Sequence, residues 1–508
     1  MSGMGLNASL QMAANSLSVS RVNMEVTGHN LANVNTPNAA RQRAQVQQDV
    51  SIPLGNGQQG MGAYVVGIQA LRSSFLDDMV TRQNSLFHLY ESREQGALLI
   101  QDALGESLST SETTITEGIS SATGLQESLN KFWDAWQDLA TDPSSTIKRS
   151  EVLSRANNLA LDIQSTYDRV LDVKAGMFEQ ASSVTSQINS YATEIAELNQ
   201  QISRVEINTL STANDLRDRR QELVERMADL VNIDVTTNGT NSAMIDIELT
   251  DANGSGNDII LVNGTDGAGA GGTHALSVTN AFSKATNTVL AISALSATGT
   301  DYTPVGAAEL PTEGELGALL ITANSDIGSQ TTVPGTQPAS SAPLSNKLHY
   351  LAGQLISLVN AQHTTGYDLD GTIGGNFFTA GGTAANIAVA ITDTDDIAAA
   401  GASGGASLGV LSGDEAQDIA NLRDNATLGE FYRSSVGDVA IIAQQAQNNY
   451  YSQELISQQL NNQREAISGI SIDEEMTNLI AYQRSFEASA RFMSTIDQMM
   501  LAVIGIGA

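Results

Sequence analysis

The 508-residue chain contains no cysteine, so disulfides, thiolate metal sites and thiol catalysis are all excluded. Only five histidines are present, at positions 29, 88, 274, 349 and 363, and no two have the spacing with which a helix presents a pair of metal ligands. We therefore predict no metal site and no cofactor.

Basic residues are scarce, with 24 Lys and Arg against 56 Asp and Glu, which gives a formal net charge of −32. A surface of this sign argues against nucleic acid and against an anionic membrane as a partner. The longest apolar runs are far shorter than the ~18 residues of a membrane span. The opening segment MSGMGLNASLQMAANSLSVSR lacks the basic start and apolar core of a secretory signal peptide. We expect a soluble chain, and export by a route without a cleaved signal stays open.

Catalytic patterns are also missing, since no Ser-His-acid or paired-carboxylate arrangement stands out. The segment DLDG at 368–371 lacks the later acidic residues of a calcium loop, and GAGAGG at 267–272 is not followed by a helical pattern. Both are interpreted as glycine turns or loops. The sequence predicts that the protein is not an enzyme.

A regular apolar repeat is present at the start of the chain. The segment HNLANVNTPNAARQ at 29–42 then interrupts it. Asn33 and Asn35 favour turns, and Thr36 is biased away from helical angles because it precedes Pro37, so the first helix should end near residue 33. The 4-3 spacing of a coiled-coil seam is kept by Leu6, Leu10, Ala13, Leu17, Ser20, Met24, Thr27 and Leu31.

The last 37 residues carry a similar seam. Ser471 is a candidate N-cap with Glu474 as its capping-box partner. An isolated helix of this kind is marginal in water, so both end helices are expected to order on assembly, by pairing with each other and with neighbouring subunits. The C-terminal seam consists of Ile472, Met476, Leu479, Phe486, Ala490 and Met493, with Gln483 as one polar step.

Further helical patterns cover about residues 75–110, 125–140, 147–175, 344–362 and 436–467, and another 4-3 seam runs from Val184 to Val205. Trp133 and Trp136 lie one turn apart and are predicted core anchors. Arg217, Arg219 and Arg220 alternate with acids. This pattern fits a solvated face with internal ion pairs, and a charged contact between subunits is the sharper alternative.

Composition shifts between residues 233 and 312 to Gly, Thr, Asn and Ser, with strand-like runs MIDIEL, DIILV and TVLAIS, and a similar texture returns at 366–412. We predict a mainly α protein with inserted β structure. The predicted domains are a discontinuous core of paired terminal helices (1–50 and 471–508), a helical-bundle inner domain (51–232, 313–365 and 413–470), an outer β domain (233–312) and a smaller β-rich, Gly-rich insertion (366–412).

Several segments together resemble a known family. NLANVNTP…RQ at 30–42 and DEEMTNLIAYQRSFEASARFMSTIDQMM at 473–500 resemble the paired ends of bacterial flagellar axial proteins of the rod–hook class. FWDAWQDLATDPSSTIKRSEVLSRANNLA at 132–160, ANDLRDRRQELVERMADLVNIDV at 213–235 and LAGQLISLVNAQHTTGYDLDGTIGGNFF at 351–378 are similar to the hook-associated family of the first hook–filament junction. The family usually has Gly-Tyr-Ser where this chain has Asn38, Ala39 and Ala40, which leaves the local packing of 36–44 undefined.

The resemblance implies a structural protein of the bacterial flagellum that assembles through its paired terminal helices. It implies export by the flagellar type III apparatus without a cleaved signal, and an extracellular location at the hook–filament junction. The implied partners are further copies of the chain, the hook protein, the second hook–filament junction protein and an export chaperone. The implied assembly interface is Leu6, Leu10, Leu17, Met24, Leu31, Asn33, Asn35, Thr36, Pro37, Ile472, Met476, Leu479, Phe486, Ala490 and Met493.

Two alternatives stay open at this point. Another flagellar axial protein, either hook protein or flagellin, would share the chain ends but not the segments at 132–160 and 213–235. A surface adhesin would use the helices as a stalk and the β region for binding. Deleting 235–312 separates them, since an adhesin would lose its activity and a junction protein would still assemble. An enzyme hidden in the β region has the least support.

Overall fold

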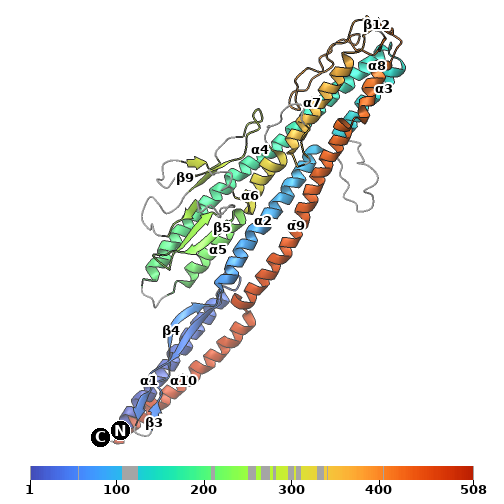
Figure 1. Cartoon of the computed structure of the whole chain (residues 1–508). Helices are drawn as coiled ribbons and strands as arrows, with labels where there is room; N and C mark the ends of the chain where they lie inside the picture. Colours follow the sequence, from blue (N-terminus) through green and yellow to red (C-terminus); the bar gives the residue numbers. More distant parts are fainter. Residues whose placement is uncertain are drawn as a thin grey trace.

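The computed structural model describes residues 2–54, 57–105, 124–207, 212–249, 259–264, 275–278, 282–295, 302–304, 311–328, 337–339, 341–403 and 406–506. The molecule is a long rod with both chain ends at the same tip (Figure 1). Long helices run along it, and small sheets lie against one side. The predicted class, mainly α with inserted β, is confirmed.

The lower part of the rod is built from the two ends of the chain. Helices α1 (Ser2–Ala32) and α10 (Ile472–Ile506) lie side by side, and an antiparallel pair of strands, β1 (Gln42–Gln48) and β4 (Ala63–Ala70), packs on α1. Between these strands β2 (Ile52–Leu54) pairs with β3 (Gly57–Gln59). We call α1, β1–β4 and α10 the terminal rod. Its strands were not predicted from the sequence.

The inner bundle continues the rod upward. Helix α2 (Ser74–Leu104) packs along α9 (Phe431–Ser468), and α3 (Leu125–Thr141), α4 (Thr146–Val205), α5 (Asn214–Leu230), α6 (Gly314–Ile321), α7 (Leu344–His363) and α8 (Asp414–Ala420) complete it. The two helical patterns predicted at 147–175 and 184–205 form one uninterrupted helix of 60 residues, because nothing between them stops a helix. In α4 the predicted seam residues Ile188, Ile195 and Ile202 are fully buried.

Two three-stranded sheets cover part of α4. The first has the order β5 (Ile233–Thr237), β6 (Ile245–Leu249), β7 (Ile259–Val262), and the second has the order β10 (Tyr302–Pro304), β9 (Ile292–Leu295), β8 (Leu276–Val278). Strands occur within all three predicted runs. Their buried residues belong to the same hydrophobic core as α4, so the described strands have no separate core of their own.

The far tip of the molecule holds an aromatic cluster. Trp133 and Trp136 are buried as predicted, and Phe132, Phe377 and Phe378 pack around them. The described part of the 366–412 insertion is mostly irregular, with isolated bridges and the two-residue strands β11 (Ala402–Ser403) and β12 (Ala406–Ser407). Within this insertion Ala399 and Ala400 are buried.

Candidate assembly surface and the joint above it

The two terminal helices are held in antiparallel register by polar contacts. The hydroxyl oxygens of Ser16 and Ser489 lie 2.8 Å apart, and Ser20 donates to Ser485 at 3.1 Å. Near the top of α1, the Asn30 side chain donates to the Glu475 carboxylate at 3.1 Å. The contacts thus follow one antiparallel register, in which a later residue of α1 pairs with an earlier residue of α10.

On α1 the buried face is made of small and polar side chains. Ala13, Ser20 and Thr27 are buried at intervals of seven residues, and Asn30 is buried near the end of the helix. Small side chains let two helix backbones approach closely, which explains why this face meets α10. The large predicted residues Leu10, Leu17, Met24 and Leu31 are only half-buried, and Leu6 lies at the start of α1, where only the backbone is described.

On α10 the predicted seam divides into two groups. Leu479, Phe486 and Met493 are half-buried and share the helix face of Glu475 and Ser489, which contact α1. Ile472, Met476 and Ala490 are instead exposed. The structure therefore brings the first three toward α1 and leaves the other three on the surface.

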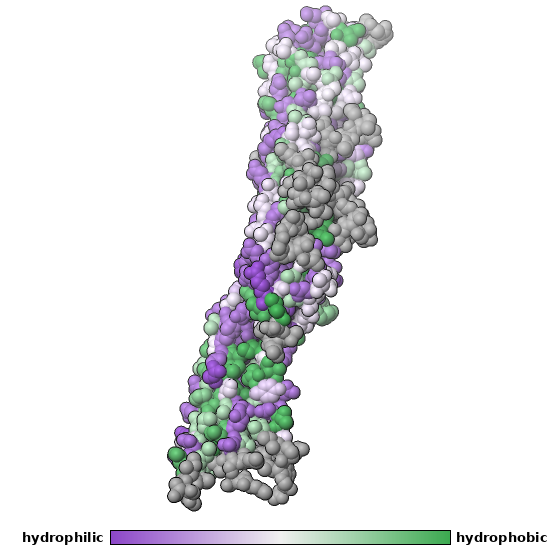
Figure 2. All heavy atoms as spheres, turned by 90° about the vertical axis from the view of Figure 1, so that its left-hand side faces the viewer, coloured by the Kyte–Doolittle hydropathy of each residue, from purple (hydrophilic) through white to green (hydrophobic). Residues whose placement is uncertain are grey.

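The surface of the terminal rod is unusually apolar for a single chain. Figure 2 shows hydrophobic residues gathered on its lower part, the face that carries the β1–β4 pair. A surface of this kind marks an interaction site. Its large exposed members, each between 38% and 78% accessible, are Val46, Val50, Tyr64, Val66, Ile68, Ile472, Met476, Ile480, Phe492, Met499 and Leu501.

The turn after α1 forms where the sequence predicts it. Helix α1 ends at Ala32, and the Asn33 side chain donates to the His29 carbonyl at 3.1 Å. Asn38 has φ = 57°, the left-handed angle that favours Gly, and its side chain donates to Glu225 of α5 at 3.0 Å. The Asn in place of the family's Gly therefore gains a contact that Gly cannot make.

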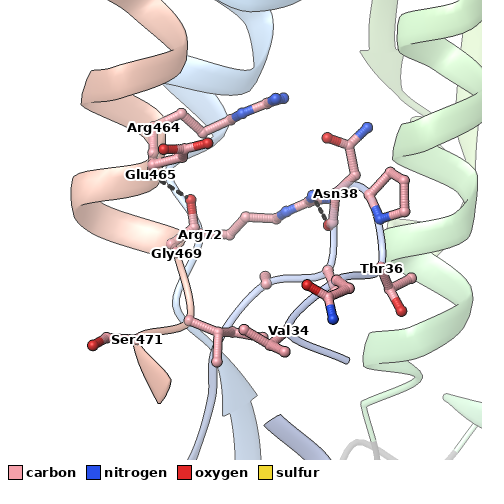
Figure 3. A pocket seen from close by; sticks show the side chains of 14 residues that line it. Val34, Thr36, Asn38, Arg72, Arg464, Glu465, Gly469 and Ser471 are labelled. Atoms are coloured by element: carbon pink, nitrogen blue, oxygen red, sulfur yellow. Dashed lines mark hydrogen bonds between the residues drawn. The ribbon is translucent and has the colours of Figure 1, made fainter. Parts of the chain in front are cut away.

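The exposed part of this turn borders an open cavity. Asn35, Thr36 and Pro37 line it together with the chain from Arg464 to Ser471, where α9 gives way to α10 (Figure 3). Its volume is about 530 Å³. The chain passes between the terminal rod and the inner bundle twice, once at this turn and once where α9 gives way to α10, and the two passages lie beside each other. We call this region, together with the charged side chains around it, the joint.

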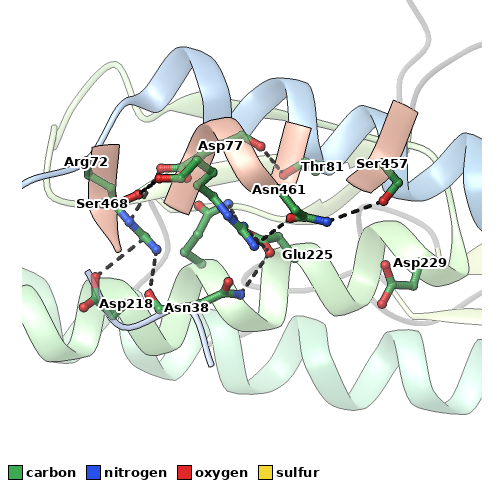
Figure 4. Close-up of polar contacts among 12 residues, drawn as sticks. Asn38, Arg72, Asp77, Thr81, Asp218, Glu225, Asp229, Ser457, Asn461 and Ser468 are labelled. Carbon is green, nitrogen blue, oxygen red and sulfur yellow. Dashed lines mark hydrogen bonds and ion pairs between the residues drawn. The ribbon is translucent and has the colours of Figure 1, made fainter. Parts of the chain in front are cut away.

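Arg464 and Glu225 form the centre of the joint. The Arg464 guanidinium donates to both Glu225 oxygens at 2.8 Å, and Asn38 donates to the same carboxylate (Figure 4). The Glu225 and Arg464 side chains are 8% and 20% exposed. One carboxylate of α5 therefore holds both α9 and the turn after α1.

Beside it, a second cluster surrounds Arg72, whose guanidinium lies 3.6 Å from Asp77 and 3.7 Å from Asp218 and donates to the Asn38 carbonyl at 2.9 Å. Burial raises the pKa of Asp77 to about 6, although Arg72 acts in the opposite direction. Burial also raises the pKa of Asp218, which accepts a hydrogen bond from the backbone of Ala40.

On the α10 side, the Arg41 guanidinium lies 2.8 Å from both Glu474 and the buried Glu475. The predicted N-cap at Ser471 is present, since its hydroxyl accepts from the Glu474 backbone at 3.5 Å. Arg41 also donates its backbone N–H to the last turn of α9 at Ser468. Both crossings between rod and bundle are therefore linked.

The charged side chains of α5 contact two neighbouring regions, the joint and helix α4. Asp218 and Glu225 face the joint, whereas Arg217 pairs with Glu206 at 2.6 Å and the buried Arg220 donates to Asn199 of α4. Arg219 pairs with Glu194 and Glu222. Arg217 and Arg219 thus form internal ion pairs, as in the first of the two interpretations offered by the sequence, whereas Arg220 is buried and not part of a solvated face.

Sequence reasoning missed two features here. The β4 strand was not predicted although its segment is rich in β-branched and aromatic residues, with Tyr64, Val66 and Ile68 at every second position, a signal that could have shown it. Arg72 and Arg464 were missed because single arginines carry no pattern. Within the described ranges there is no cluster of three potential metal ligands, and none of the helices described is long and apolar enough to cross a membrane.

Comparison with known proteins agrees with this architecture. Residues 111–378 match the family model of the flagellar hook-associated protein FlgK helical domain, and residues 462–506 match that of the flagellar basal body rod FlgEFG protein C-terminal region. A solved structure, described as the flagellar hook junction protein FlgK from Burkholderia pseudomallei, has the same fold, with a TM-score of 0.61 at 14% identity over 77% of this chain and all of the other.

Proteins named flagellar hook-associated protein 1 are similar along much or all of the chain. The Bacillus subtilis protein is 25% identical over 98% of both chains, and the Escherichia coli protein is 22% identical over 99% of this chain and all of the other. The Salmonella typhimurium protein is 26% identical over 74% of this chain and 60% of its own.

Fold, paired ends and apolar rod surface define a structural protein of the flagellar axial class. More narrowly, the chain belongs to the flagellar hook-associated protein FlgK family, whose helical-domain model covers more than half of it. It is a flagellar component that forms the junction between hook and filament.

Proposed function

We propose that the terminal rod is the assembly element of this junction protein. The observation that carries the proposal is the division of α10, in which one face pairs with α1 while Ile472, Met476 and Ile480 remain 42–51% exposed. Burying a large apolar side chain contributes roughly 1.5–3 kcal/mol, so an array of them can offset the cost of ordering two helices. The end helices order fully when neighbouring copies cover this face.

The predicted interface residues then have three roles. Leu479, Phe486 and Met493 support the pairing of α10 with α1, and Ile472, Met476 and Ala490 meet other subunits together with the half-buried Leu10, Leu17, Met24 and Leu31 of α1. Leu6 belongs to the same interface by its place in the repeat. The turn residues Asn33, Asn35, Thr36 and Pro37 direct the chain from the rod to the bundle.

The partners follow from a place between hook and filament. Copies of the chain contact one another, the hook protein contacts one end of the zone, and the second hook–filament junction protein contacts the other. The type III apparatus exports the chain without a cleaved signal, and an export chaperone covers the apolar face of α10 beforehand. The role is structural and not enzymatic.

The proposed domains keep a terminal rod for assembly and an inner bundle above it. We revise one predicted boundary, the end of the N-terminal part of the terminal domain at residue 50. Strands β1 and β4 pack on α1, so we place the boundary of the terminal rod near Leu71, where Arg72 begins the joint. The outer sheets within 233–312 pack on α4, and the insertion at 366–412 lies at the far tip of the bundle.

Ile480→Asp tests the proposal, because it places a charge on the exposed apolar face without touching the contact with α1. We expect at least a tenfold loss of the chain from purified flagella, with the inner bundle folded by circular dichroism. Thr477→Asp, at an exposed position of the same helix, is the matched control and should incorporate. Normal incorporation of Ile480→Asp would refute the assembly role of this face.

A further inference from the structure

Helix α9 presents an outward surface that is almost without charge. From Ile441 to Gln463 every exposed residue is apolar or neutral polar, and the one charged residue of the segment, Glu454, is half-buried. The chain as a whole carries a net charge of −32, so a neutral surface along about six turns of helix is unexpected from composition.

This surface has the spacing of a packing seam. The inward face of α9 meets α2 through a 3-4 repeat that includes Val436, Val439, Ala443 and Ala446, all buried. The opposite face repeats in the same way. In a coiled coil such outward positions normally carry charged, solvent-facing residues. Here they are Ile441, Gln444, Asn448, Tyr451, Leu455, Gln458 and Asn462.

The large side chains of the outward seam are well exposed. Ile441 and Tyr451 are 54% exposed and Leu455 is 67% exposed. Figure 1 shows α9 at the edge of the bundle, on the side away from the β5–β7 sheet. None of the described elements covers this face of α9. It therefore has the apolar and amide groups of an interface without an intramolecular partner.

Two charged residues near the ends of the seam are paired within the chain. Asp438 pairs with Lys347 at 2.6 Å, and Arg464 pairs with Glu225 at 2.8 Å. A surface whose one charged residue is the half-buried Glu454 is a place where two copies of a strongly acidic chain meet little like-charge repulsion. Amide side chains can also donate and accept hydrogen bonds across such a contact.

We propose that the outward face of α9, from Ile441 to Asn462, packs against a second copy of this chain in the assembled junction. The inference rests on the proposed function, because it requires that copies assemble side by side. In an array around an axis the contact joins unlike faces of neighbouring copies, so the α9 seam meets another surface of the next copy. Asn448 and Asn462 would fix the register, as buried amides do in coiled coils.

The absence of cysteine makes a direct test possible, since a single introduced thiol reports one position only. Ser452→Cys lies on the exposed side of α9, Ser494→Cys on the exposed side of α10 and Ser154→Cys on the exposed side of α4. Each full-length variant is labelled with a maleimide as free chain and within purified flagella, and mass spectrometry gives the labelled fraction.

We expect Ser452→Cys to be labelled at least tenfold more slowly in flagella than in the free chain. Ser494→Cys reports the terminal rod and should also be protected, whereas Ser154→Cys should not. Protection of Ser494→Cys with unchanged labelling of Ser452→Cys would overturn the α9 contact and leave the proposed function intact. Loss of protection at Ser494→Cys would count against the proposed function itself.

A charge at the seam gives an independent measurement. Asn448→Glu replaces a poor helix former by a good one and adds a negative charge, and we expect at least a tenfold loss of the chain from flagella. Ser154→Glu on α4 is the matched control with the same charge and should incorporate normally. If Asn448→Glu folds and incorporates like Ser154→Glu, the α9 seam is not an interface.

Discussion

At the scale of single residues, Glu225 is the most connected side chain of the joint. It accepts hydrogen bonds from Asn38 of the turn, Gln221 of α5 and Arg464 of α9. Removing one member of a buried ion pair leaves the other charge without compensation and typically costs about 3–5 kcal/mol. The joint should therefore depend on this carboxylate far more than on any ion pair at the surface.

Glu225→Ala should lower the local unfolding free energy of the joint by about 3 kcal/mol. Hydrogen exchange of the backbone at 36–42 and 464–470 measures it. Glu194→Ala, which breaks the exposed pair with Arg219, is the control and should cost no more than about 1 kcal/mol. Equal exchange in the two variants would contradict the central role of Glu225.

At the far tip, His363 is held neutral by its contacts. Its Nδ1–H donates to the Gly375 carbonyl at 2.7 Å, and its Nε2 accepts from the Ala398 backbone N–H at 2.9 Å. Burial lowers the pKa of His363 to about 4. Protonation of Nε2 would break the second hydrogen bond.

This depressed pKa predicts a loss of stability on acidification. The unfolded chain binds a proton near pH 6.5 and the folded chain only near pH 4, so stability from this group falls as the pH is lowered between these values. Between pH 7 and pH 5 the loss should be about 2 kcal/mol. Urea unfolding should show a loss smaller by this amount in His363→Gln, and identical losses in variant and parent would refute it.

At the scale of elements, α1 shows what periodicity can and cannot predict. The 4-3 repeat correctly indicated the helix, and the Asn-Pro turn correctly indicated its end near residue 33. It could not indicate that the small members of the repeat face α10 while the leucines are half-buried, because the choice depends on how closely the two backbones approach. The same limit explains why Ile472 and Met476 fall outside the contact with α1.

Ser20→Leu tests the close approach of α1 and α10, because Ser20 is 4% exposed and donates to Ser485. Overpacking of this kind typically costs about 1–3 kcal/mol. Hydrogen exchange of α10 should become at least fivefold faster, while α2 and α9 keep their protection. Ser18→Leu, at an exposed position one half-turn away, should change neither, and equal effects from both substitutions would contradict the predicted packing.

The strands of the terminal rod and the joint escaped prediction for a physical reason. Asn38 and Glu225 are 187 residues apart, and Arg41 and Glu474 are 433 residues apart. Contacts of such separation are fixed by the fold and leave no local pattern in the chain. The terminal helices, the tryptophan anchors and the Asn-Pro turn are local and were predictable.

At the scale of the whole molecule, the outer sheets are less separable than their composition suggests. Ile247, Leu261 and Ile292 are fully buried in the core that also contains α4. Deleting 235–312 would uncover the seam of α4, so that deletion changes folding as well as any binding by the sheets. Substitutions on the exposed side of the sheets are the better test of what they contact.

The most direct measurement of the junction role is electron microscopy of cells that lack this gene, with the culture medium probed for flagellin. A structural connector between hook and filament predicts intact hooks without filaments, and flagellin released to the medium. Normal filaments on the mutant cells, or the loss of the hooks themselves, would contradict it.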